Sequence, residues 1–349
     1  MKQNRRLSIR LLIVALYLAG ALGLLLCTRA SAPWPEAAAM RDAAERAQTA
    51  FAALKDEKLE RGYVLSPETD PNRTGLIGDF FTPITTTLGN LEAKRTSTNP
   101  NAAALVVHLL YEAGVRPGDR IAVNCSGSFP ALNLSVLCAM DAMELDGTIF
   151  CSVGASTYGA NLEGFTYPDM EHFLYTNGYL HHRSTAFSLG GENDQGLEFP
   201  AEIRQAICAR LETFGYEYWD HADLEENIRS RLARYGSVGC FVNVGGNLVS
   251  TGGSTAFDSG SGLLQHAASR EGLLGGYLEK GIPVLHFLNL KKLFPQYGLP
   301  VDPVPLPQAG EGALYQNSAA NPRIAWVLLT GGVLLLLWAV KGQGTCPPL

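Results

Sequence analysis

Two uncharged apolar segments, residues 11–27 and 324–340, lie near opposite ends of this 349-residue chain, and all of its acidic residues fall between them. At about 1.5 Å per residue, 17 residues in a helix reach roughly 25 Å, which is enough to cross a bilayer. Four basic residues lie between Lys2 and Arg10, so the positive-inside rule places the amino terminus in the cytoplasm. Two crossings predict a cell-membrane protein with both termini cytoplasmic and its main domain extracytoplasmic.

The first apolar segment has a competing interpretation as a cleaved signal peptide. Ala30, Ser31 and Ala32 follow it with the small-x-small pattern of a cleavage site. Pro33 comes next, and its rigid ring at the scissile position argues against cleavage, so we expect the segment to stay as an anchor. Both interpretations leave the large domain outside. The second segment follows a proline-rich stretch at 300–307, which favours a membrane span over a buried core helix.

The residues between the two apolar segments are strongly acidic. Residues 31–321 contain 20 basic and 33 acidic residues, which gives a net charge of about −13. Neutralising nucleic-acid phosphates requires clustered Lys and Arg, and no such run occurs, so we expect no nucleic-acid partner. The whole chain is 46% hydrophobic and 17% charged, and this composition excludes a disordered protein.

Seven cysteines are scattered along the chain without a Cys-x-x-Cys pair. Their spacing fits small buried hydrophobic residues better than a disulfide framework or a zinc site. An extracytoplasmic location permits a disulfide, but the spacing predicts none. We expect no metal and no cofactor, although Glu192 and Asp194 form an acid pair that a histidine could complete.

Short apolar runs alternate with helical patterns from residue 116 onward. The predicted strands are 120–124, 147–153, 184–189, 240–244 and 283–288. The predicted helices are 130–143, 169–176, 200–214, 224–235 and 273–280. This alternation predicts an α/β domain, with a mostly parallel sheet and helices on both faces, flanked by amino- and carboxyl-terminal transmembrane helices. The expected domains are a tip and anchor at 1–32, a membrane-proximal helix at 33–62, the α/β domain at 63–299, a Pro-rich linker at 300–322 and a second transmembrane helix with its tail at 323–349.

Loops rich in glycine, serine and asparagine follow four of the predicted strands, at 126–130, 154–159, 190–194 and 245–247. In open α/β sheets, ligands bind outside the carboxyl ends of the strands, where glycine allows the backbone to approach a ligand. The alternative is that these residues only turn and cap the chain. Four such loops at one edge favour a cleft. Neither a GxGxxG motif nor a P-loop is present, so nucleotide binding is not supported.

The segment 82–100 is dense in hydroxyl groups and carries Lys94 and Arg95. Such a stretch could donate hydrogen bonds to a carboxylate or amide ligand. It could equally be a solvated loop that caps a helix at 101–112. The candidate ligand-binding residues are Thr85, Thr86, Thr87, Asn90, Lys94, Arg95, Ser126, Gly127, Ser128, Ser156, Gly190, Gly191, Glu192, Gly245, Gly246 and Asn247.

The loop sequences also carry a resemblance to a known family. The strings that carry it are 74–78, 84–101, 126–133, 152–161, 188–194 and 242–250. Over about residues 36–295 the chain resembles the bacterial poly-gamma-glutamate system protein family. The resemblance implies a membrane-anchored accessory component of the synthesis or export of poly-γ-glutamate, an anionic capsule polymer. It implies the polymer and membrane-bound synthase subunits as partners, and it supplies no settled catalytic residues.

A catalytic alternative is a γ-glutamyl hydrolase or transferase that uses a serine nucleophile at the strand-to-helix turn 126–130. The candidate residues are Ser126 and Ser128, with Glu192 as an acidic group nearby. This chemistry requires a base such as histidine within hydrogen-bond reach and an oxyanion hole. The chain lacks a Gly-x-Ser-x-Gly elbow, and none of its seven histidines lies in a sequence pattern that indicates a catalytic base. The sequence leaves both the binding and the catalytic interpretation open.

Overall fold

The computed structural model describes residues 2–27, 29–320 and 322–341, and it divides into two compact units. The first unit combines residues 1–34 with 316–349, and the second comprises residues 35–315.

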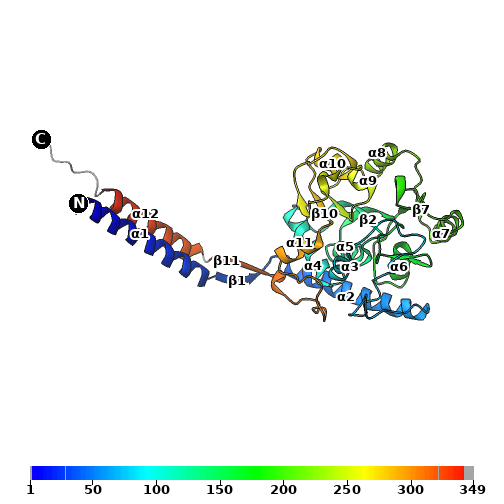
Figure 1. The fold of residues 1–349 in the computed structure, drawn as a ribbon, viewed down its shortest axis with the longest axis horizontal. Coiled ribbons are helices and arrows are strands. Elements are labelled where there is room, and N and C mark those ends of the chain that lie inside the picture. The colour runs from blue at the N-terminus through cyan, green and yellow to red at the C-terminus, as the bar shows by residue number, and fades with distance from the viewer. Residues whose placement is uncertain (1, 28, 321, 342–349) are drawn as a thin grey trace. The chain divides into compact units, whose positions relative to one another are not determined.

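The first unit is a helical hairpin closed by a two-stranded ribbon. Its elements are α1 (Lys2–Cys27), β1 (Arg29–Pro33), β11 (Gln316–Ala320) and α12 (Pro322–Lys341). The strands pair antiparallel, with Pro33 opposite Gln316. The Tyr17 hydroxyl donates to the Leu328 carbonyl oxygen at 2.7 Å, and the Arg10 guanidinium lies 4.8 Å from the centre of the Trp338 ring. The two helices run antiparallel, so the amino end of α1 and the carboxyl end of α12 lie at the same end of the hairpin (Figure 1).

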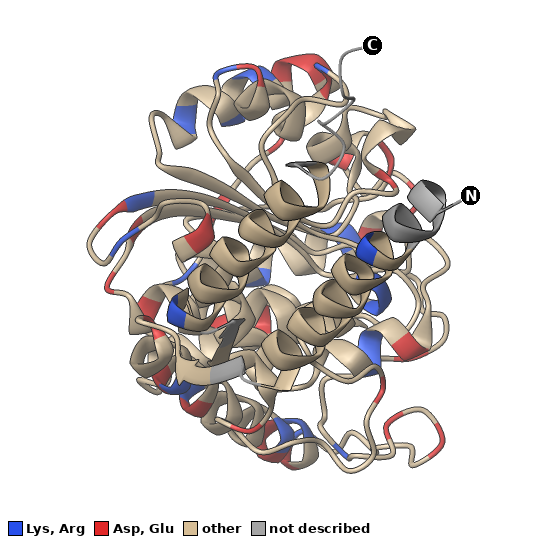
Figure 2. Cartoon of the chain, turned by 90° about the vertical axis from the view of Figure 1, so that its left-hand side faces the viewer, with Lys and Arg blue, Asp and Glu red and all other residues tan. Residues whose placement is uncertain are grey.

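Both terminal helices are long and apolar enough to cross a membrane. The candidate spans are Ile9–Cys27 and Pro322–Val340, with mean hydropathies of 2.4 and 2.0. Figure 2 shows the two helices with few charged residues along their length. Large apolar side chains on them are exposed, such as Leu16 and Leu334 at 65% and 67%. The predicted apolar segments are therefore helical, and their outward surface suits hydrocarbon better than water.

The second unit is built on a seven-stranded sheet in the order β7-β6-β3-β2-β8-β10-β9. Its strands are β2 (Arg120–Ser126), β3 (Asp146–Ser152), β6 (Ala186–Ser188), β7 (Glu217–Tyr218), β8 (Cys240–Val244), β9 (Gly262–Leu264) and β10 (Val284–Phe287). All neighbours pair parallel except the edge strand β9. The prediction of an α/β fold with a mostly parallel sheet is confirmed. From β2 the chain adds strands first on one side and then, from β8, on the other, so the strand order switches between β2 and β8.

Helices lie on both sides of this sheet (Figure 1). They are α2 (Ala37–Glu60), α3 (Leu91–Ser97), α4 (Asn101–Glu112), α5 (Pro130–Ala142), α6 (Tyr167–Thr176), α7 (Ala201–Thr213), α8 (Leu224–Tyr235), α9 (Leu248–Thr251), α10 (Gly272–Leu278) and α11 (Leu290–Gln296). On one face, Phe150 and Phe241 of the sheet pack with Tyr235 of α8 and Tyr277 of α10. The Ala-rich helix α2 packs against α4 and α5. Burial of apolar side chains on both faces explains why the central strands read as continuous hydrophobic runs.

Smaller elements complete the unit. They are the hairpin of β4 (Asn161–Leu162) and β5 (Phe165–Thr166) and the 3-10 helices η1 (Glu192–Asp194), η2 (Thr255–Phe257) and η3 (Ala313–Tyr315). The proline-rich residues 300–312 contain no helix or strand. They pack back on the domain, because Arg95 of α3 pairs with Asp302 and Asn101 of α4 donates to the Gln308 carbonyl oxygen at 2.9 Å.

Candidate functional site

A cavity of about 850 Å³ lies at the carboxyl ends of the central parallel strands, where the strand order switches. Loops that follow β2, β3, β6, β8 and β10 contribute to its wall, together with the segment from Thr86 to Lys94. The four loops expected from the sequence therefore do meet at one edge of the sheet. This is the position at which open α/β sheets bind their ligands.

Most of the expected ligand-binding residues line this cavity. They are Thr86, Thr87, Asn90, Lys94, Ser126, Ser128, Ser156, Gly191, Glu192, Gly246 and Asn247. The others, Thr85, Arg95, Gly127, Gly190 and Gly245, lie outside the lining.

Three of those outside the lining make close contacts elsewhere in the domain. Thr85 Oγ1 accepts a hydrogen bond from Asn161 Nδ2 at 2.9 Å. A Cβ atom on Gly127 would lie 2.4 Å from the Val153 carbonyl oxygen, so the loops after β2 and β3 touch there. Arg95 Nε donates to Asp302 Oδ1 at 2.7 Å. Successive residues of a helix point roughly 100° apart, which is why Lys94 faces the cavity while Arg95 does not.

Several lining residues were not expected from the sequence. They include Gly89, Phe129, Glu198, Leu248, Thr251, Leu288, Asn289, Leu290 and Lys291. Leu288–Lys291 directly follow β10, which the sequence did predict as a strand. The rule that ligands bind beyond strand ends applied there too, but this loop lacks the glycine and serine that marked the other four.

Lys94 is the most buried charged residue of the lining, with 2% of its surface exposed. Its Nζ donates to Ser156 Oγ at 2.7 Å and to the Ser128 carbonyl oxygen, and it lies 3.9 Å from the centre of the Phe129 ring. Among the described residues, no carboxylate forms an ion pair with Lys94. Burial without a counter-ion lowers the pKa of Lys94 to about 7.

Two acidic residues, Glu192 and Glu198, also line the cavity. The Glu198 carboxylate accepts a hydrogen bond from the Glu192 backbone nitrogen at 3.1 Å. A Cβ atom on Gly191 would lie 2.0 Å from Glu198 Oε1, so only glycine leaves room for this carboxylate. Lys291, another lining residue, pairs with Glu92 of α3. The cavity therefore presents groups of both charges together with many backbone and hydroxyl groups.

The serines proposed as nucleophiles at the turn 126–130 hydrogen-bond within the loops. Ser126 Oγ accepts from the Ser128 backbone nitrogen at 3.3 Å, and Ser128 Oγ accepts from the Ser156 backbone nitrogen at 3.0 Å. In the described part of the chain, no histidine or carboxylate hydrogen-bonds to either hydroxyl. Glu192 also lines the cavity and takes part in neither of these contacts. Among the residues that the structure describes, neither Ser126 nor Ser128 therefore has a hydrogen-bonded histidine or carboxylate as a base.

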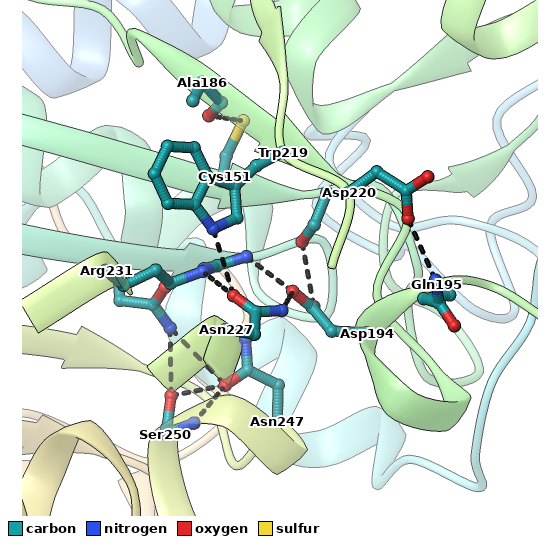
Figure 3. Close-up of polar contacts among 12 residues, drawn as sticks. Cys151, Ala186, Asp194, Gln195, Trp219, Asp220, Asn227, Arg231, Asn247 and Ser250 are labelled. Carbon is teal, nitrogen blue, oxygen red and sulfur yellow. Dashed lines mark hydrogen bonds and ion pairs between the residues drawn. The ribbon is translucent and has the colours of Figure 1, made fainter. Parts of the chain in front are cut away.

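A buried polar network beneath the cavity connects two of its loops, those after β6 and β8 (Figure 3). Arg231 of α8 is fully buried and pairs with Asp194 of the loop after β6, with 2.5 Å between Nη2 and Oδ2. Its Nη1 donates to Asn124 Oδ1 of β2 at 2.9 Å. Asn124 Nδ2 donates in turn to Ser250 Oγ of α9 at 2.9 Å, and Ser250 bonds to Asn247. The lining residue Asn247 is thus anchored to the ion pair.

Comparisons of this chain with protein-family models, with curated proteins and with solved structures found no match.

Proposed function

We propose that this chain is a membrane-anchored accessory component of poly-γ-glutamate synthesis or export, which binds the polymer at the outer side of the membrane. The observation that carries the proposal is the cavity at the strand ends, because the strings that resemble the poly-gamma-glutamate family supply most of its wall. Synthase subunits in the membrane are the expected protein partners. Figure 1 labels elements that surround the cavity: the strands β2 and β10 and the helices α3, α9 and α11.

The chemistry of the cavity suits a γ-linked glutamate chain. Each repeat of that polymer carries an amide and a free α-carboxylate, so it needs both hydrogen-bond donors and acceptors. Thr86, Thr87, Asn90 and Ser128 supply such groups, and Lys94 adds a basic nitrogen. About 850 Å³ lies within the range of small-ligand sites, so the cavity would hold a short stretch of the polymer.

The net charge of about −13 between the apolar segments limits how the polymer can be held. In physiological salt, screening confines the interaction between exposed charges to about 8 to 10 Å. Repulsion of the polymer by the acidic surface therefore acts only over short distances, as does its attraction to hydrogen-bond donors in the cavity. The polymer would therefore be retained only where backbone and side-chain donors contact it. A surface that repels the remainder of the chain would favour its passage away from the membrane.

The membrane arrangement is part of the same proposal. The helices α1 and α12 would cross the bilayer, with both termini in the cytoplasm and residues 35–315 outside. The antiparallel contacts between the helices support termini on a common side, and the basic residues near the amino terminus support the cytoplasmic side.

Protease added to intact cells, stripped of outer layers, is expected to digest residues 35–315 and to leave a carboxyl-terminal epitope tag protected on a short fragment. Immunoblotting of that tag measures the result. A cytoplasmic marker that stays intact is the control for lysis. If the large unit survives in intact cells and is digested only after lysis, the proposed orientation is wrong.

Binding is tested by replacing Gly246, which lines the cavity. We expect Gly246→Val to weaken the binding of oligo-γ-glutamate about tenfold, because the new side chain would occupy space where the backbone meets the ligand. A Cβ atom at Gly246 would meet only the flexible Leu288 side chain, at 3.3 Å, so the fold should be retained. Calorimetric titration of the full chain in detergent at low salt measures the affinity.

The matched control for this titration is Gly239→Val. Gly239 is exposed beside the amino end of β8, at the opposite edge of the sheet, and a Cβ atom there would meet nothing closer than 3.6 Å. This variant should bind like the wild type. Absence of binding by the wild-type chain at low salt would exclude the polymer as a ligand and favour a scaffold that contacts only its membrane partners.

A further inference from the structure

A hydroxyl group and an amine meet inside the cavity, and neither has an acidic partner among the residues that the structure describes. Ser156 Oγ lies 2.7 Å from Lys94 Nζ, and the two residues come from separate walls, the loop after β3 and the helix α3. Both are buried, with 7% and 2% of their surfaces exposed, yet both line the cavity. A serine that hydrogen-bonds to a lysine in this way is one of the recurrent nucleophile and base arrangements.

The backbone holds Ser156 firmly in this position. Its nitrogen donates to Ser128 Oγ at 3.0 Å, and its carbonyl oxygen accepts from the Gly159 nitrogen at 2.9 Å. The next residue, Thr157, exchanges hydrogen bonds with both backbone groups of Gly89, at 2.7 and 3.1 Å. A reactive hydroxyl needs such a fixed position, because misplacement of the reacting atoms costs rate steeply.

Gly89 closes over the pair. A Cβ atom on this residue would lie 2.8 Å from Ser156 Oγ and 3.2 Å from Lys94 Cε. The absence of a side chain therefore lets the main chain approach the Ser156 hydroxyl and the end of the Lys94 side chain together without displacing either one. This close approach helps to exclude water from the amine.

The surroundings of Lys94 suit a base. A lysine can take a proton only when it is neutral, and a nearby carboxylate would keep it charged. Among the described residues the contacts of its Nζ are the Ser156 hydroxyl, the Ser128 carbonyl oxygen and the Phe129 ring, none of which is a carboxylate. Desolvation lowers the pKa of Lys94 to about 7, so a substantial part of the protein carries the neutral amine near neutral pH.

We propose that Ser156 and Lys94 are the nucleophile and the general base of an acyl-transfer site that acts on γ-glutamyl amide bonds. Ser156 Oγ forms a bond to the acyl carbon while its proton passes to Lys94 Nζ. The carbon–nitrogen bond then breaks, and the leaving amine takes the proton from Lys94. In hydrolysis, water forms the new bond to the acyl carbon and loses a proton to Lys94, which returns it to Ser156 Oγ as that oxygen leaves.

The assignment of the substrate rests on the proposed function, whereas the reactivity of the pair does not. Cutting or transferring γ-glutamyl chains at the membrane surface would let this chain set the length of the polymer. The nucleophile differs from the serines at 126–130, because neither of those hydroxyls contacts the amine of Lys94.

A fluorophosphonate reagent tests the pair without reference to the polymer. It phosphonylates activated serines with loss of fluoride. With the full chain in detergent, we expect the phosphonyl group on Ser156, located by peptide mass spectrometry.

Ser156→Ala should abolish the label at that peptide. Lys94→Arg should slow labelling at least about 100-fold, because arginine keeps a positive charge but cannot accept the proton. The wild-type labelling rate should rise with pH through about 7. Ser230→Ala, on α8 and away from the cavity lining, should label like the wild type.

Further outcomes separate this inference from the proposed function. A folded wild-type chain that stays unlabelled at Ser156 between pH 6 and pH 9 overturns the reactive pair, and the binding titration is unaffected by that result. Cleavage of oligo-γ-glutamate is measured by mass spectrometry of the oligomer. If Ser156 is labelled but the oligomer is not cleaved, the assigned substrate is wrong.

If circular dichroism shows that Lys94→Arg does not fold, Ser156→Cys provides the second test. Its thiol should react with iodoacetamide faster than the buried native cysteines, and equal rates would contradict activation by Lys94.

Discussion

Replacing Arg231 with methionine is expected to lower the free energy of unfolding of the large unit by about 3–5 kcal/mol. The guanidinium is fully buried, and its partner Asp194 is only 3% exposed. Removing the cation would strand a buried charge, which costs far more than the pair itself contributes. Asn124 would lose its donor from Nη1 as well. The loops after β6 and β8 should therefore loosen together, and ligand binding at the cavity should fall with them.

Denaturant unfolding of the full chain in detergent, followed by circular dichroism, measures this loss. Arg234→Met provides the matched control, because Arg234 lies on the same helix and pairs with Glu217, but both side chains are 48% exposed. Such a pair is worth less than about 1 kcal/mol. The double variant Arg231→Met with Asp194→Leu should recover part of the stability, since no charge is then left unpaired. Equal losses for Arg231→Met and Arg234→Met would show that the buried network does not hold the loops.

The stability of the large unit is expected to increase as the pH rises from about 7 to about 10, and Lys94→Met should remove part of that increase. The pKa of Lys94 is about 7 in the folded chain against an ordinary value of 10.5. Between these values the unfolded chain binds a proton that the folded chain does not, so raising the pH favours folding. The slope contributed by one such group is at most about 1.4 kcal/mol per pH unit.

Lys58 contributes in the same direction over a narrower range. Burial lowers its pKa to about 8, and its Nζ donates to the Gly75 and Ile77 carbonyl oxygens. Measuring unfolding at several pH values for Lys94→Met, Lys58→Met and the exposed control Lys292→Met separates the contributions. Lys94→Met should flatten the curve from about pH 7, Lys58→Met from about pH 8, and Lys292→Met should keep the wild-type slope. Identical slopes for the wild type and Lys94→Met would mean that Lys94 is not desolvated in solution.

The central sheet could be predicted because its strands are buried on both faces. Mostly apolar runs such as 240–244 favour a fully buried position in a domain of this size, and glycine-rich turns mark their ends. The edge strands β7 and β9 escaped prediction, because they span two and three residues and carry no comparable pattern. The helix α3 was also missed, since its seven residues lie inside a segment whose hydroxyl content resembles a loop.

The candidate site was predicted only in part for a different reason. Individual loops could be found from glycine and serine at strand ends, but pairs of side chains depend on how those loops pack. Ser156 and Lys94 are 62 residues apart in the sequence and are brought together by packing of their segments, which includes the hydrogen bonds that join residues 87–89 to Thr157. The fully buried Arg231 likewise occurs in a helix whose sequence gave no sign of an ion pair with Asp194.

The pairing of β1 with β11 has a practical consequence for engineering. Pro33 lies opposite Gln316, so the polypeptide enters and leaves residues 35–315 at neighbouring points. Domains with adjacent ends are well suited to insertion into a host protein. The large unit could thus be transplanted between two antiparallel strands of a water-soluble carrier, with the ribbon replaced by the strands of the carrier, and produced without any lipid.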